Sequence, residues 1–188
     1  FAAMSQEEFV KHRRERTGEI WKRTLPNDPH QTLETDELLI VGDVPESRLQ
    51  EVEGWATAHL GKLRRTFDAG DEPLWKGKLA ILVFKERFGL TEYATSIRSF
   101  RAPDGMFGES VVTATHSDAY VVVQDVGDEP SNTHPGLKAN LIDHLTGAFL
   151  QRKGPLPEWI TRGTGLLMAA QDQPASPYVK QIPRQALA

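Results

Sequence analysis

The fold is decided by two neighbouring stretches of sequence, LIDHLTGAFL at residues 141–150 and GPLPEWITRGTG at residues 154–165. Apolar side chains recur at helical spacing through the first stretch, which predicts an amphipathic helix over about residues 135–152. Pro157 has the position of a first helical residue, and Trp159 follows on what reads as the apolar side of a second helix. The two stretches therefore predict a pair of helices joined by a short link, with Trp159 packed in a core.

These stretches resemble the active-site segment of gluzincin metallopeptidases, and of the peptidase MA-like group in particular. There the pattern reads about H-E-L-x-H-x-x-L, then L-P-x-W-L-x-E-G-x-A after a short link. In the resemblance Asp143 stands at the first ligand histidine, His144 at the catalytic glutamate, Gly147 at the second histidine and Arg162 at the ligand glutamate. The apolar frame is kept and the chemistry is not, so the resemblance implies a pseudo-peptidase with a degenerate motif and no catalytic residue.

The residues at these four positions make a poor zinc site, and this holds independently of the resemblance. Catalytic zinc normally takes three protein ligands and keeps a fourth position open. Gly147 has no side chain, and Arg162 carries a permanent cation that cannot be deprotonated to bind a metal. Only Asp143 is left as a ligand, so we expect neither a metal nor another cofactor. If the helices pack as the resemblance implies, Asp143 and Arg162 approach each other and form an ion pair where zinc would lie.

The rest of the chain predicts an α+β fold with a small, mostly antiparallel or mixed sheet and packed helices, like the N-terminal half of a gluzincin. The sequence predicts strands at residues 37–44, 79–84, 110–115 and 119–124, the last two as a hairpin. It predicts helices near residues 5–23, 45–67 and 88–100, with a capping box at Ser5. We divide the chain into a helical extension at 1–36, the pseudo-peptidase domain at 37–170 and an irregular tail at 171–188.

Composition narrows the class of protein. The 188 residues suffice for one domain, and a net charge of −4 spread over mixed-sign segments favours no nucleic-acid partner. The basic run at residues 11–16 reads as a solvated helix face. No apolar run is long enough to span a membrane, so we expect a soluble chain without membrane insertion. It contains no cysteine, so the compartment stays open, and an extracytoplasmic place within a longer exported protein is compatible with the sequence.

Two alternatives to a pseudo-peptidase remain. A hydrolase with a rearranged site would use a metal held by Asp143, His144 and a loop histidine such as His116 or His134, or would use His144 as general base and Arg162 as oxyanion stabiliser. The other alternative is an unrelated α+β binding domain. Helical neighbours such as Asp143 and His144 point about 100° apart, which weakens a shared catalytic role.

Our leading hypothesis is a non-catalytic interaction or scaffold domain of a larger bacterial protein. The cleft implied by the resemblance lies between a sheet edge and two helices, and in active relatives such a cleft holds an extended peptide by strand addition. The expected partner is a protein or peptide, a neighbouring domain of the same chain, or a second copy of the chain.

Overall fold

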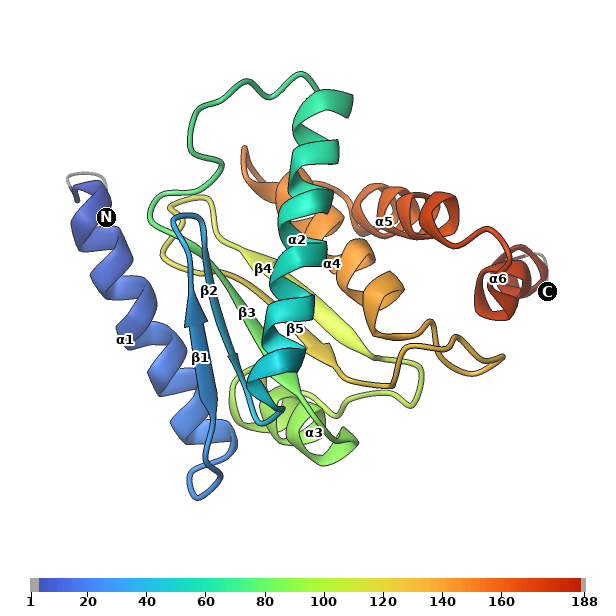
Figure 1. Cartoon of the computed structure of the whole chain (residues 1–188), viewed down its shortest axis with the longest axis horizontal. Coiled ribbons are helices and arrows are strands. Elements are labelled where there is room, and N and C mark those ends of the chain that lie inside the picture. The colour runs from blue at the N-terminus through green and yellow to red at the C-terminus, as the bar shows by residue number, and fades with distance from the viewer. Residues whose placement is uncertain (1–3, 187–188) are drawn as a thin grey trace.

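The computed structural model describes residues 4–186 of the chain. Within this range the chain forms six helices and five strands (Figure 1). In chain order they are α1 (Gln6–Thr24), β1 (Gln31–Glu34), β2 (Leu38–Gly42), α2 (Glu46–Thr66), β3 (Leu79–Phe84), α3 (Arg87–Ser96), β4 (Gly108–Val112), β5 (Ala119–Gln124), α4 (Leu137–Gln151), α5 (Glu158–Asp172) and α6 (Pro177–Ala186). The α+β class predicted from the sequence is confirmed.

All five strands belong to one mixed sheet with the order β1-β2-β3-β5-β4. The three central strands are parallel, while β1 and β4 run antiparallel to their neighbours at the two edges. The central strands are almost wholly apolar and buried, because both faces of the sheet are covered. The predicted hairpin of β4 and β5 is confirmed, with Ser110 opposite Val121.

Two hydrophobic cores lie on opposite faces of this sheet. Alternate strand residues, such as Ile40 and Ile81, pack with α2 and α4 into the larger core. Their neighbours, such as Leu39 and Leu82, pack with the last turn of α1 and with α3 into the smaller one. Helix α5 lies against α4, and α6 follows it on the same side of the molecule (Figure 1). Edge strand β4, α4, α5 and α6 thus come together at one side of the fold.

Helix α1 begins where the sequence predicts it. The Ser5 hydroxyl accepts a hydrogen bond from the backbone of Glu8, and the Glu8 carboxylate accepts one from the backbone of Ser5, which is a capping box. The basic run on this helix is not a uniformly solvated face, because Arg13 is fully buried. Its guanidinium donates to the backbone oxygens of Lys78, His116 and Ser117. It thus ties α1 to two other segments, the start of β3 and the turn between β4 and β5.

Two parts of the chain differ from the sequence analysis. Strand β1 was not predicted, and it pairs with β2 across the boundary placed at residue 37. The tail expected to be irregular contains helix α6. Residues 1–3 and 187–188, which belong to the predicted extension and tail, lie outside the described residues. Among the residues described, no helix combines the length and the apolar character needed to cross a bilayer.

Candidate functional site

Helices α4 and α5 cross closely because small residues line their contact. A Cβ atom added to Gly165 would lie 2.1 Å from Oδ1 of Asp143 and 2.6 Å from its backbone oxygen. Real side chains do not approach so closely, so only glycine fits at this position. The crossing brings the first turn of α5 over the middle of α4, and with it Arg162 over Asp143.

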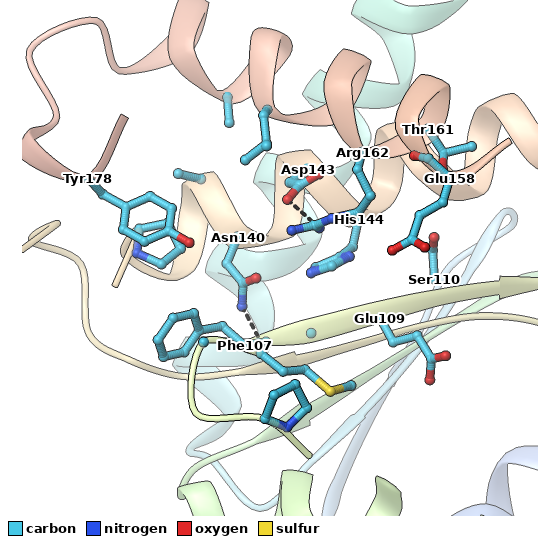
Figure 2. A pocket seen from close by; sticks show the side chains of 18 of the residues that line it. Phe107, Glu109, Ser110, Asn140, Asp143, His144, Glu158, Thr161, Arg162 and Tyr178 are labelled. Atoms are coloured by element: carbon cyan, nitrogen blue, oxygen red, sulfur yellow. Dashed lines mark hydrogen bonds and ion pairs between the residues drawn. The ribbon is translucent and has the colours of Figure 1, made fainter. Parts of the chain in front are cut away.

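Asp143 and Arg162 form an ion pair. Nη1 of Arg162 donates to Oδ2 of Asp143 over 2.6 Å, which is a short, charge-assisted hydrogen bond (Figure 2). The two side chains differ in exposure, because 8% of the Asp143 side chain and 41% of the Arg162 side chain are accessible to solvent. The carboxylate is thus held inside the protein, and the guanidinium reaches from it into the open pocket.

The environment of Asp143 disfavours its charge. Burial raises the pKa of its carboxyl to about 6, although the nearby cation of Arg162 acts in the opposite direction. Oδ1 is buried and has no hydrogen-bond partner among the described residues. A fraction of the Asp143 side chains is therefore protonated near neutral pH, and the ion pair weakens as the pH falls.

His144 points away from Asp143 and toward edge strand β4. Its ring lies against Gly108, where an added Cβ would come within 2.5 Å of Cδ2 and 2.7 Å of Nε2. Burial lowers the pKa of His144 to about 3, and the positive charge of Arg162 adds to this effect. The imidazole is neutral at physiological pH and is a weak base.

Gly147 faces Ser110 on the same strand. A Cβ atom at position 147 would lie 2.7 Å from the Ser110 hydroxyl oxygen, so the two residues are in direct contact across the helix and the strand. The structure brings Asp143 and Arg162 together, places His144 beside them without a hydrogen bond to either, and leaves Gly147 apart from both.

A pocket of about 490 Å³ opens beside the ion pair. Its walls come from β4 and the loop before it, from α4 and α5, and from the start of α6. Figure 2 shows Tyr178 at one end of the pocket and Glu158, Thr161 and Ser110 at the other, with Asn140, Asp143 and His144 between them. Asn140 is anchored because its Nδ2 donates to the backbone oxygen of Phe107 over 2.7 Å.

Strand β4 ends the sheet order and leaves one side of its backbone without a strand partner in the part of the chain that is described. Gln124 donates to the oxygen of Phe107, and Thr113 donates to the oxygen of Asp118. Hydrogen-bonded positions alternate along an antiparallel pair, so the odd-numbered residues from 107 to 113 face β5. The N–H and C=O groups of Gly108, Ser110 and Val112 therefore point away from β5, and Gly108 and Ser110 also line the pocket.

The loop histidines do not join this site as a pair. His116 accepts a hydrogen bond from the backbone of Lys76 at Nδ1 and donates from Nε2 to the backbone oxygen of Arg152, so both ring nitrogens are engaged in the fold. His134 lies beside the ring of Phe107, with centroids 6.4 Å apart. Among residues 4–186, no three histidine or acidic side chains gather in a metal-binding arrangement.

Sequence reasoning missed several residues of the site. Tyr178 lies in a segment that was expected to be irregular. Asn140 lies just before the first quoted stretch, and Glu158 stands at a variable position of the second, so no signal in the sequence marks any of the three. The prediction for Trp159 was wrong, because its side chain is 76% exposed at the start of α5 instead of lying in a core. Comparison of the sequence with known family models and with curated proteins finds no match.

Proposed function

We propose that the chain is a non-catalytic, peptidase-like binding module that holds an extended peptide along the outer side of β4. The observation that carries the proposal is the pocket between an open strand edge and the helix pair, which the ion pair of Asp143 and Arg162 lines. In the resemblance these two positions belong to metal ligands. Here their side chains form an ion pair with each other, and a pocket lies beside them.

The outward groups of β4 support strand addition. Three residues in succession along the strand edge, Gly108, Ser110 and Val112, offer N–H donors and C=O acceptors to an added chain. A partner strand gains main-chain hydrogen bonds from such an edge whatever its side chains are, and its alternate side chains reach the pocket. The pocket is lined by both apolar and polar groups, among them Met106, Leu166 and Asn140, which suits a peptide more than a purely apolar ligand.

The residues favour binding over hydrolysis. A general base works best when its pKa lies near the working pH, whereas the pKa of His144 is lowered to about 3. Asp143 does not orient the imidazole, because its Oδ2 is bound by Arg162 and the two helical neighbours point apart. The guanidinium of Arg162 is a permanent cation at one oxygen of Asp143, and it repels a metal ion that would bind there.

The test measures binding of extended peptides and the effect of blocking one N–H group. A pool of N-acetylated ten-residue peptides is titrated against the ¹⁵N-labelled chain, and chemical-shift changes are expected along β4, α4 and the first turn of α5. Ser110→Pro removes an outward N–H and keeps the bonds to β5, since proline is tolerated on edge strands. It should weaken binding roughly tenfold, the effect of one lost hydrogen bond of about 1.4 kcal/mol.

Ser110→Ala is the matched control, because it removes the hydroxyl and keeps the backbone donor. It should bind as the unchanged protein does. The proposal fails if no peptide in the pool binds, or if shifts appear on another face of the molecule. Equal affinity of the proline and alanine variants would exclude strand addition to β4.

A further inference from the structure

The pocket has a wall at one end. Tyr178 at the start of α6 packs edge to face against Phe107, with ring centroids 6.5 Å apart and planes at 80°. Phe107 also lies beside the ring of His134, with centroids 6.4 Å apart. Phe107 directly precedes Gly108, so these rings stand where β4 begins. Figure 2 shows Phe107 and Tyr178 at this end of the pocket. A chain added along β4 meets this wall at the Gly108 end of the strand.

The direction of β4 decides which end of a peptide meets the wall. An antiparallel strand added to β4 runs from Val112 toward Gly108, and antiparallel pairing is slightly more stable per residue than parallel pairing. The carboxyl end of the peptide then arrives at the wall formed by Phe107 and Tyr178. An added parallel strand would bring its amino end there instead.

The charges in the pocket distinguish these two directions. A terminal amine needs a free acidic acceptor. Glu109 is engaged by Tyr93 and Arg98 on the other face of the sheet, and Glu158 lies at the end of the pocket away from Tyr178. Asp143 is buried and already bound by Arg162. No other acidic side chain among the described residues lines the pocket, so its walled half has no acceptor for an amine.

A terminal carboxylate, in contrast, meets a donor. Arg162 has five N–H donors, of which one is used in the bond to Asp143. Its side chain is 41% exposed and lines the pocket between the wall and Glu158. Guanidinium groups bind carboxylates through two parallel hydrogen bonds, and the remaining donors of Arg162 suffice for that.

We infer that the pocket is a dead-end site for the C-terminus of an extended peptide, with the terminal carboxylate bound by Arg162 and the chain stopped by Tyr178 and Phe107. The inference rests on the proposed function and adds the class of ligand to it. Internal segments of a long chain are excluded, because they would have to continue through the aromatic wall.

The experiment compares two N-acetylated pools of the same ten-residue peptides, one ending in a free carboxylate and one in an amide. Affinities are measured by fluorescence anisotropy with a label on the side chain of a lysine placed as the first residue of every peptide. The acid pool should bind at least tenfold more tightly than the amide pool. Arg162→Gln should remove this preference. Arg14→Gln is the control and should keep the preference for acids. Arg14 of α1 forms an ion pair with Glu34 of β1, and neither residue lines the pocket.

The double variant Asp143→Asn with Arg162→Gln controls for misfolding, because it leaves no unpaired buried charge. It should also lose the preference for acids. Asp143→Asn alone frees the guanidinium and should strengthen it. Equal binding of acids and amides at the cleft overturns the inference and leaves the peptide-binding proposal standing. A preference that survives in both Arg162 variants also overturns it. If neither pool binds, the proposed function itself fails.

Discussion

At the scale of single residues, Asp143 couples the site to pH. Its pKa is about 6 in the folded protein and 3.8 in the reference state, so between these values the folded chain binds a proton that the unfolded chain does not. This contribution to stability is present below 3.8 and is lost as the pH rises through 6. The charged carboxylate at neutral pH thus costs about 3 kcal/mol relative to the protonated form.

His144 acts in the opposite sense over an overlapping range. Its folded pKa of about 3 lies below the reference value of 6.5, so its contribution is present above 6.5 and is lost as the pH falls toward 3. The two effects partly cancel in the unchanged protein. A substitution that acts on one member of the site is therefore needed to reveal either of them.

Arg162→Ala should destabilise the protein at pH 8 and have little effect at pH 5. Removing the cation leaves a buried carboxylate unpaired at pH 8. We expect this to lower the free energy of unfolding by roughly 1 to 3 kcal/mol. At pH 5 Asp143 is mostly protonated, and the loss should nearly vanish. Urea unfolding at the two pH values measures the difference.

The control for this prediction is Arg14→Ala. That residue pairs with Glu34 at the surface, where its side chain is 57% exposed, and exposed pairs contribute less than about 1 kcal/mol. The pKa of Glu34 is lowered mainly by Arg14, so any effect of this pair is present at pH 8 and persists at pH 5. An equal loss for Arg162→Ala at both pH values would mean that the arginine acts through packing alone.

At the scale of the elements, the crossing of α4 and α5 depends on where the glycines of α5 lie. Gly165→Ala would place a methyl group 2.1 Å from the Asp143 carboxylate, so the helices must separate and the ion pair must break. We expect a loss of at least 2 kcal/mol, about the effect of overpacking in a core. Thermal and urea unfolding measure it.

Gly163 provides the matched control in the same helix. It is exposed, and a Cβ atom there would meet no atom within 4 Å. Gly163→Ala should therefore stabilise the protein by about 0.5 to 1 kcal/mol, the gain in helix propensity. If both variants change stability by the same amount, the contact of Gly165 with Asp143 is not what holds the two helices together.

Elements with a strong apolar period were predictable, and elements that depend on their surroundings were not. The runs Leu79–Phe84 and Ala119–Gln124 are apolar and buried, and their composition alone marks both as strands. That Ala119–Gln124 is also a central strand, parallel to β3, was not predicted. Strand β1 has only Leu33 half-buried, and its pairing with β2 supplies what its sequence does not. Prolines 174, 177 and 183 favour an irregular tail locally, but Pro177 begins α6, where its missing N–H costs nothing.

The same limit applied to the candidate site. The resemblance named Asp143 and Arg162, because both lie within a quoted motif. It could not place Tyr178, Asn140 or Glu158 in the pocket, since these meet only through the packing of α4, α5 and α6. The burial of Arg13 could not be predicted for a similar reason. Three backbone oxygens that are distant in the sequence accept hydrogen bonds from it, and the basic run at residues 11–16 gives no sign of them.

At the scale of the whole molecule, the fold consists of one sheet with a core on each face, and the N-terminal segment contributes to both the sheet and a core. Ile20 and Trp21 of α1 are buried in the smaller core beside Leu39 and Leu82, and β1 extends the sheet beyond β2. The edge that carries the candidate site is at the opposite side, where β4 meets α4 and α5 (Figure 1). Residues 4–36 therefore support the sheet from the side away from the pocket.

Removing residues 1–36 should abolish cooperative folding. The truncation exposes the apolar groups that Ile20 and Trp21 cover, each worth about 1.5 to 3 kcal/mol, and also removes the hydrogen bonds of Arg13 and the pairing of β1. The sum is comparable with the whole stability of a domain, which is about 5 to 15 kcal/mol. Circular dichroism, size-exclusion chromatography and urea unfolding of a chain that begins at Glu37 test this expectation.

Ending the chain at Gln173 is the contrasting truncation. It removes α6, whose described contacts are few and include the ring contact of Tyr178 with Phe107, and it leaves both cores intact. This protein should unfold cooperatively within a few degrees of the full chain. Because it lacks Tyr178, which forms one side of the aromatic wall, it should also bind peptides that are extended at the C-terminus beyond the position of the wall. A cooperatively folded chain from Glu37, with the stability of the full chain, would instead show that residues 1–36 are an appendage to a domain that folds without them.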